Sequence, residues 1–435
     1  MTNQLTITAS TVEPALLELP WGTPLADWPN ETIVSLPKGI SRHLVRFVNL
    51  SGRVVAVKET TEAMARREYD MLGNLARLDA PCVDRVAVIA GRRDADGEPL
   101  PAALVTAHLK FSLPYRALFT QVLRPDTATR LVDALAVLLV RLHNVGFFWG
   151  DVSLSNTLFR RDAGAFAAYL VDAETGELHE AGLTPGQRAH DLDVARTNIA
   201  GEIMDLEAGG RLDRGVDAIE IADGIMSAYA SLWRELTEIE TFDAAEAWRI
   251  TERVERLNEL GFDIGEMSMS ATVDGARVSI QPKVVDAGHH QRRLLRLTGL
   301  DVEENQARRL LNDLDDFRAR RTRLEGDEEM IAHEWVTRVF EPVVRAIPFE
   351  LRAKLEPAEV FHQLLEHRWY ASQAQGRSIP LAEALTSYID NVLRFRRDEA
   401  TVMGPPTDTM AIPLVTDVIA TRSPSIGPID WRDLV

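Results

Sequence analysis

The stretch "GDVSLSN" places Asp151 and Asn156 five positions apart between two apolar runs. Either residue alone is a common turn former. Lys58 and Glu68 lie upstream and Asp172 lies downstream, so the chain holds every group that phosphoryl transfer from ATP requires. These groups are a cation for the α- and β-phosphates, an anion that holds this cation, oxygen ligands for Mg²⁺ and an aspartate facing the nucleophile. The residue types and their order therefore predict a nucleotide site.

The elements expected around these residues have to position them. "RVVAVKE" is rich in β-branched residues and predicts a strand that carries Lys58 near its end. In "TEAMARREYDMLGNLARL" apolar residues recur at helical spacing, so Glu68 is expected on a helix from which it can reach back to the lysine. Asp172 follows "YLV" at the expected end of another strand.

The pattern of apolar and β-branched residues between 31 and 109 predicts three strands, a helix and two further strands. Ser51–Gly52 is expected as a tight turn between the second and third strands. Residues 1–30 contain four prolines and are expected to be irregular. Residues 110–240 are mainly helical in their pattern.

Residues 241–400 predict a third, α-rich unit. The segment "EMSMSATVDGARVSIQPKVV" within it alternates in polarity around Asp274-Gly275, which is a strong hairpin signal. Residues 401–435 are rich in Pro, Thr and Ser with little charge, and we expect a poorly ordered tail there.

Composition limits the classes of protein that the chain can represent. The 48 basic and 66 acidic residues give a net charge of −18, which argues against non-specific binding to nucleic acid. The single cysteine, Cys82, excludes an internal disulfide framework and a cysteine zinc cluster. The N-terminus lacks the pattern of a signal peptide, and no apolar run approaches membrane-spanning length. We therefore expect a cytoplasmic protein without a membrane span.

The stretch "RLHNVGFFWGDVSLSN" resembles a motif of the protein-kinase-like superfamily, in which Leu-His and a glycine precede Gly-Asp, four residues and Asn. It is most similar to the lipopolysaccharide (Kdo/WaaP-like) kinases and the RIO kinases, and the resemblance covers roughly residues 31–240. The whole chain resembles the bacterial domain-of-unknown-function 4032 family. These resemblances imply an α+β, bilobal protein-kinase-like fold (N-lobe 31–109, C-lobe 110–240) with an α-rich C-terminal domain that contains a β-hairpin.

The resemblance also implies a role for each site residue. Lys58 would contact the α- and β-phosphates of ATP and pair with Glu68. Asp151 would orient and partly deprotonate the acceptor hydroxyl. Asn156 and Asp172 would ligate Mg²⁺, which prefers oxygen ligands.

Further positions follow from the resemblance or depart from it. Asp193 would steady the loop around the catalytic aspartate, with Asp191 nearly as good a candidate. Trp149 replaces the histidine of the motif, and it can pack but cannot make the same hydrogen bonds. The usual Asp-Phe-Gly is "DAETG" here. The glycine-rich loop is reduced to "PKGISRH", in which Gly39 and Ser41 would present backbone N–H groups and a hydroxyl to phosphate.

Two functions from different classes remain open. The first is an enzyme that transfers the γ-phosphoryl group of ATP to a hydroxyl of an unidentified small molecule, sugar or protein. The second is a pseudokinase that serves as a nucleotide-sensing or protein-interaction scaffold, which the thin glycine loop favours. Transfer of the AMP moiety is a third possibility. The C-terminal domain could also bind a protein partner.

His289 and His290 follow the expected hairpin. Adjacent side chains on a helix diverge by about 100°, and no cysteine or close acidic pair accompanies these two. We therefore expect them to be surface or partner-facing residues and not metal ligands.

Overall fold

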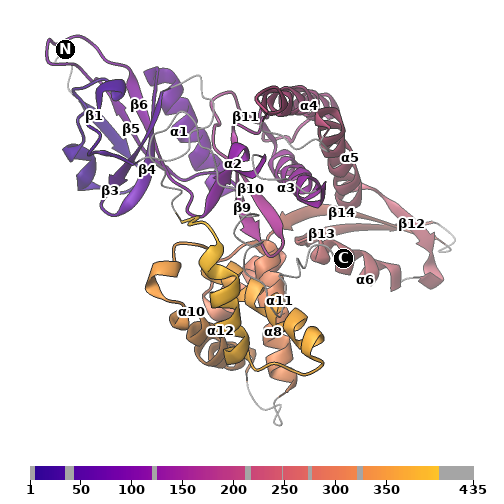
Figure 1. Cartoon of the computed structure of the whole chain (residues 1–435). Helices are drawn as coiled ribbons and strands as arrows, with labels where there is room; N and C mark the ends of the chain where they lie inside the picture. Colours follow the sequence, from indigo (N-terminus) through magenta and orange to yellow (C-terminus); the bar gives the residue numbers. More distant parts are fainter. Residues whose placement is uncertain are drawn as a thin grey trace.

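The computed structural model describes seven stretches of the chain, residues 5–34, 44–119, 125–210, 217–246, 248–272, 277–320 and 327–400. Helices and strands are mixed within them, which is compatible with the α+β class expected from the sequence. Figure 1 shows a sheet near the N-terminus, helices α3 to α5 beside it, a smaller sheet with β12 to β14, and a separate group of helices toward the C-terminal end.

An antiparallel six-stranded sheet forms the N-terminal part. Its strands lie in the spatial order β1-β5-β6-β4-β3-β2, and the helix α1 packs against β5 and β6. The elements are β1 (Thr6–Ala9), β2 (Ile33–Val34), β3 (Val45–Leu50), β4 (Arg53–Thr60), α1 (Glu62–Arg77), β5 (Arg85–Ala90) and β6 (Ala102–Ala107).

The order from β2 to β6 is the predicted order of strands and helix between residues 31 and 109. The turn between β3 and β4 is also confirmed, since Leu50 pairs with Arg53 and only Ser51 and Gly52 lie between them. Both turn residues have positive φ, 51° and 83°, as a tight hairpin turn requires.

The expectation that residues 1–30 are irregular is wrong for part of this segment. β1 pairs with β5 at one edge of the sheet, and two 3₁₀ helices follow, η1 (Pro14–Glu18) and η2 (Leu25–Asp27). Leu16, Trp21 and Trp28 are buried against the sheet. The prolines interrupt the apolar pattern, so the sequence does not reveal this packing.

The middle of the chain is built around the long helices α3, α4 and α5 and a β-hairpin. The hairpin strands β9 and β10 pair in antiparallel register, and β7 adds a third strand beside β9. The elements are β7 (Ser112–Pro114), α2 (Tyr115–Phe119), α3 (Pro125–Asn144), β8 (Phe147–Phe148), β9 (Thr157–Asp162), β10 (Ala165–Leu170), β11 (Glu177–Leu178), α4 (Pro185–Ala208) and α5 (Ala218–Thr237).

A three-stranded sheet follows, in the order β12-β14-β13. β13 and β14 pair along their length, which confirms the predicted hairpin, although its tip at Asp274 and Gly275 lies outside the described residues. The elements are β12 (Glu240–Asp243), η3 (Ala244–Glu246), α6 (Trp248–Glu259), β13 (Phe262–Ala271) and β14 (Arg277–Ala287).

The C-terminal elements are helices that form a hydrophobic core of their own. Buried residues of β13 and β14 instead belong to the core built on α3 to α5, so the unit predicted at residues 241–400 contributes to two cores. The tail expected at 401–435 lies outside the described residues. The helices are α7 (His289–Thr298), α8 (Glu304–Ala319), α9 (Glu328–Trp335), η4 (Val336–Phe340), α10 (Glu341–Ala346), η5 (Phe349–Leu351), α11 (Pro357–Gln375), α12 (Leu381–Asn391) and η6 (Leu393–Phe395).

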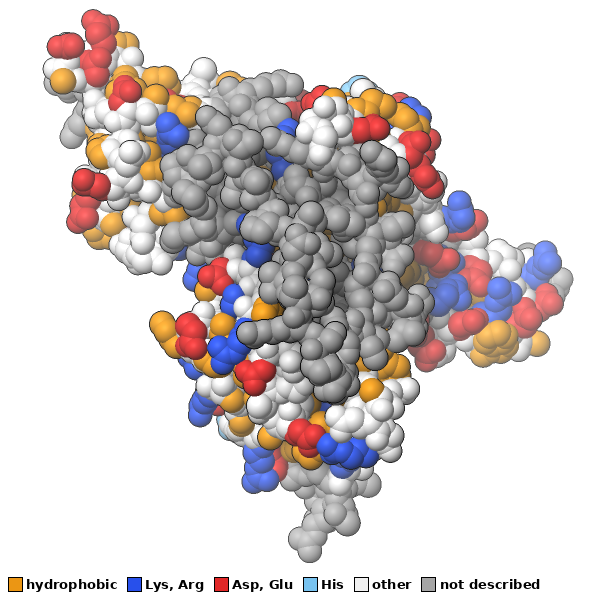
Figure 2. All heavy atoms as spheres, viewed as in Figure 1, with side chains coloured by type: hydrophobic (Ala, Val, Ile, Leu, Met, Phe, Trp, Pro, Cys, Tyr) orange, Lys and Arg blue, Asp and Glu red, His pale blue; other side chains and the backbone are white. Residues whose placement is uncertain are grey.

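The described surface mixes charges of both signs. Figure 2 shows acidic and basic side chains interspersed on the arm that contains α6 and β12 to β14. There Arg249, Arg253 and Arg256 all form ion pairs with Glu240. Among the described helices, none has the length and apolar character needed to cross a bilayer.

Candidate functional site

β4 positions Lys58 in the interior of the N-terminal sheet, where Val45 of β3 and Leu104 of β6 are its neighbours in register. Thr61 then caps α1, because its side chain accepts a hydrogen bond from the backbone N–H of Met64. The strand thus ends and the helix begins within four residues of the lysine. This connection brings Glu68 of the helix back to Lys58, as the sequence predicts.

Three carboxylates surround the Lys58 ammonium. Its Nζ lies 3.0 Å from Oε2 of Glu68, 2.7 Å from Oδ2 of Asp172 and 3.0 Å from Oε2 of Glu174. Asp172 is 114 residues away in the chain, so the fold brings together three predicted site residues from separate elements. Glu174 was not predicted as a site residue. The only signal for it in the sequence is an acidic residue two positions after Asp172 in "DAETG".

The charges in this cluster shift one another's protonation. Burial by itself would lower the pKa of Lys58, but Glu68 and Asp172 outweigh it and hold that pKa above its usual value. Burial and the nearby Asp172 carboxylate raise the pKa of Glu68 to about 8, although the lysine opposes this change. The cluster holds one ammonium against three carboxyl groups, so it favours the addition of positive charge.

The β9–β10 hairpin places Asn156 and Asp172 at the same end of the sheet. Thr157, the first residue of β9, pairs with Leu170, the last residue of β10. Asn156 precedes this pair, Asp172 follows it by two residues, and the backbone N–H of Val171 donates to the carbonyl of Asn156 at 3.0 Å. The two predicted metal ligands therefore lie on adjoining segments.

The loop before β9 holds Asp151. The Asn156 side-chain amide donates to the Asp151 backbone carbonyl at 3.1 Å and to its carboxylate at 3.3 Å. Asn198 of α4 donates to the Val152 carbonyl at 3.0 Å and to Asp151 Oδ1 at 3.4 Å. The Asn156 amide nitrogen therefore faces Asp151.

The residue that steadies this loop is Asp191, and the prediction of Asp193 is wrong. The Asp191 carboxylate is fully buried and accepts hydrogen bonds from the backbone N–H groups of Trp149 and Gly150, both at 2.7 Å. It also lies 3.2 Å from Nε2 of His143. Residues two apart on a helix point about 200° apart, and accordingly Asp193 is exposed.

Trp149 is fully buried, as expected for a packing residue. Its indole N–H also donates to the backbone carbonyl of Asp172 at 3.0 Å, and its own carbonyl accepts from the Thr175 hydroxyl at 2.8 Å. The indole therefore connects the loop of Asp151 to the segment of Asp172. The sequence gives no local sign of this hydrogen bond, because the partner carbonyl lies 23 residues further along the chain.

The structure does not test two of the predicted site residues. Gly39 and Ser41, the expected phosphate-binding loop, lie outside the described residues. Their role stays a prediction.

Two of the residues near this cluster suit Mg²⁺ as ligands. Carboxylate oxygens of Glu68, Asp172 and Glu174 lie within 4.8 Å of one another around the Lys58 ammonium, and Asn156 lies on the segment beside Asp172. Carboxylate and amide oxygens are the ligands that this hard cation prefers. The side chains of Asp172 and Asn156 therefore fit a magnesium ion by their chemistry.

His289 and His290 do not form part of a comparable group within the described chain. His289 pairs with Asp263, and His290 lies 2.6 Å from Oε1 of Glu304. Contrary to the expectation that they diverge, the two rings meet edge to face with centroids 4.8 Å apart. Their contacts are ion-pair contacts within the fold.

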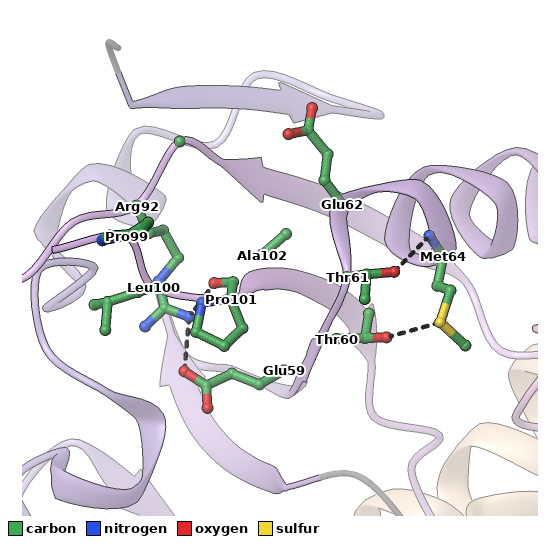
Figure 3. A pocket seen from close by; sticks show the side chains of 11 residues that line it. Glu59, Thr60, Thr61, Glu62, Met64, Arg92, Pro99, Leu100, Pro101 and Ala102 are labelled. Atoms are coloured by element: carbon green, nitrogen blue, oxygen red, sulfur yellow. Dashed lines mark hydrogen bonds and ion pairs between the residues drawn. The ribbon is translucent and has the colours of Figure 1, made fainter.

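A separate pocket of about 590 Å³ lies at the end of β4 (Figure 3). Glu59 lines it together with Thr61 and Met64 at the start of α1, and Arg92 pairs with Glu59 at 2.8 Å. Neither Lys58 nor any of the three carboxylates around it lines this pocket, so the pocket is distinct from that cluster.

One comparison with known proteins agrees with a resemblance expected from the sequence. A protein-family model described as "Domain of unknown function (DUF4032)" matches residues 231–393, which confirms that resemblance for this part of the chain. A solved structure titled "WaaP in complex with acyl carrier protein" matches 52% of this chain and 89% of that chain at 19% sequence identity. Its TM-score of 0.32 is too low to assign the fold. A search of curated proteins returns no match.

Proposed function

We propose that the protein is an ATP-dependent phosphotransferase with a bilobal kinase-like fold, in which residues 31–109 form the N-lobe and residues 110–240 the C-lobe. It transfers the γ-phosphoryl group to a hydroxyl of a small molecule, a sugar or a protein. One observation carries this proposal. Lys58 of the N-terminal sheet contacts both Glu68 of α1 and Asp172 beyond β10, so it joins the two lobes at one cluster.

Each residue then has a task in binding. Lys58 contacts the α- and β-phosphates, and Glu68 holds the ammonium in place. Asn156 and Asp172 hold Mg²⁺, which neutralises charge on the phosphate oxygens when it is bound. Trp149 supports Asp172 through its hydrogen bond to the Asp172 backbone.

Asp151 faces the acceptor in the reaction step. The acceptor oxygen forms a bond to the γ-phosphorus while the bond from that phosphorus to the β,γ-bridging oxygen breaks and releases ADP. The hydroxyl proton passes to the Asp151 carboxylate. Hydrogen bonds from Asn156 and Asn198 orient this carboxylate, and Asp191 holds the backbone before it.

A scaffold that binds nucleotide without turnover is the second candidate. It is favoured by the single glycine in the expected phosphate-binding loop "PKGISRH". Transfer of AMP from the same site would release pyrophosphate instead of ADP, and mass spectrometry of the products separates the two reactions.

Replacement of Asp151 tests the enzyme proposal. Incubation of the wild type with γ-labelled ATP and metabolite extracts is expected to label an acceptor. Asp151→Ala is expected to reduce labelling by about 100-fold or more, because proton transfer by a positioned group contributes about 10²–10⁴-fold. Nucleotide affinity should persist, since Asp151 is not a proposed metal ligand.

Asp193→Ala, which changes an exposed aspartate of α4, is the matched control and should label normally. An Asp151→Ala variant that labels at the wild-type rate would refute the assigned role. A wild type that binds nucleotide but labels nothing, against extracts and proteins alike, would favour the scaffold.

A further inference from the structure

The proposed nucleotide site contains one charged group that none of the tasks above uses. Glu174 lies two residues beyond Asp172, in the turn that follows β10. Its Oε2 lies 3.0 Å from the Lys58 ammonium, and its side chain is only 17% exposed. The backbone N–H of Glu174 donates to Oδ1 of Asp172 at 3.0 Å, which fixes the start of this turn.

Three carboxylates surround the donors of Lys58. All three lie within 3.0 Å of Nζ, Glu68 and Asp172 through hydrogen bonds and Glu174 through an ion pair. An ammonium group has three N–H donors. A phosphate oxygen that approaches this ammonium therefore competes with these carboxylates.

Two of the three carboxylates have tasks that require them to stay. Glu68 is almost fully buried and anchors the ammonium to α1. Asp172 is held by the Trp149 indole and is a proposed metal ligand. Glu174 is the one that a phosphate can replace without loss of a proposed function.

We propose that Glu174 sets the nucleotide affinity of this site, because its carboxylate contacts Lys58 and competes with phosphate for it. This inference rests on the proposed function. Charge acts in the same direction as the competition, since the Glu174 carboxylate beside the ammonium repels the polyanionic phosphate chain.

The experiment compares the dissociation constant of ATP for the wild type and for Glu174→Gln, by calorimetry, in Mg²⁺ and in EDTA. The amide keeps the size of the side chain and removes its charge. We expect the dissociation constant to fall roughly tenfold under both conditions, the scale of one hydrogen bond to a charged group. A merely structural role would not produce this result, because structural damage weakens binding.

Glu177→Gln is the matched control, because Glu177 is an exposed carboxylate three residues further on and pairs with Arg67 rather than with Lys58. It should bind as the wild type does. Glu174→Ala is a second variant with the same expected direction, in case the glutamine variant does not fold.

The outcomes separate this inference from the proposed function. Equal binding by the wild type and Glu174→Gln would overturn the competition and leave the nucleotide site standing. If the variant binds ATP more weakly than the wild type in Mg²⁺ but not in EDTA, Glu174 is a metal ligand, and the proposed competition is overturned as well. If neither protein binds ATP, the proposed function fails and this inference with it.

Discussion

The indole of Trp149 links two segments that must keep a fixed distance for the proposed chemistry. Its N–H reaches the Asp172 carbonyl at 3.0 Å, while its backbone N–H reaches Asp191 at 2.7 Å. The side chain is fully buried, so water cannot replace the bond if the donor is removed.

Trp149→Phe should therefore cost stability and metal affinity together. The phenylalanine keeps an aromatic ring but leaves the buried carbonyl without this donor, which costs about 1–3 kcal/mol in unfolding free energy. The Mg²⁺ concentration needed for half-maximal ATP binding should rise.

Trp335→Phe is the matched control for this substitution. Trp335 is also fully buried and donates to Asp313 at 2.8 Å, but it lies in the core of the C-terminal helices. It should lose stability without a change in Mg²⁺ dependence. If both variants keep wild-type Mg²⁺ dependence, the link through Trp149 has no bearing on the metal site.

At this scale the sequence identified residues whose type and order carry the chemistry, and missed those that depend on direction. Lys58, Glu68 and Asp172 could be found because each has a distinctive neighbour pattern, and the structure brings them together. Asp191 and Asp193 differ only in the side of α4 to which they point. Without the packing of α4 against the loop, the sequence could not choose between them.

The β9–β10 hairpin is the element that joins the proposed site to the C-terminal helices. One face of it packs into the core with α3, where Phe159 and Ala168 are buried. From the other face Arg160 contacts Glu303 at 2.7 Å and Tyr169 donates to the same carboxylate. Asp162 accepts hydrogen bonds from the backbone N–H groups of residues 305 and 306, at the start of α8.

This placement of Asp162 predicts a pH-dependent stability. Burial and the Glu303 carboxylate raise the pKa of Asp162 to about 7, against about 3.9 in an unfolded chain. The folded protein thus keeps a proton that the unfolded chain releases. The contribution of this group to the unfolding free energy is full below about pH 4 and is lost as the pH rises to about 7.

Asp162→Asn removes this titration. The variant should therefore become more stable relative to the wild type, in unfolding free energy, as the pH rises from 5 to 7. Urea unfolding at pH 5, 6, 7 and 8 measures the difference. Asp315→Asn changes an exposed residue of α8 and should track the wild type at every pH. A constant difference between Asp162→Asn and the wild type would contradict the raised pKa.

Elements were predictable where a local pattern is strong. The β3–β4 and β13–β14 hairpins follow turn residues that the sequence shows directly. β1 was missed because its four residues gain stability from pairing with β5, which lies about 80 positions later and leaves no local pattern. The contacts between Arg160 and Glu303 are equally invisible in the sequence, since 143 residues separate the partners.

The described chain combines the cluster around Lys58 with a C-terminal helical unit. The family match at residues 231–393 covers this unit and not the Lys58 cluster, so the family description does not assign the site. The domain boundaries expected at residues 110 and 241 remain predictions. The acceptor also remains to be identified.

Binding of Mg-ATP at the cluster of Lys58 and Asp172 is the central claim, and thermal unfolding tests it most directly. At 100 times its dissociation constant, a ligand stabilises the folded protein by about 2.7 kcal/mol, which corresponds to an upward shift of a few degrees in Tm. We predict this shift for the wild type and for Asp193→Ala, and loss of most of it for Asp172→Ala. No shift in the wild type at saturating Mg-ATP, or an equal shift in Asp172→Ala, would contradict the account.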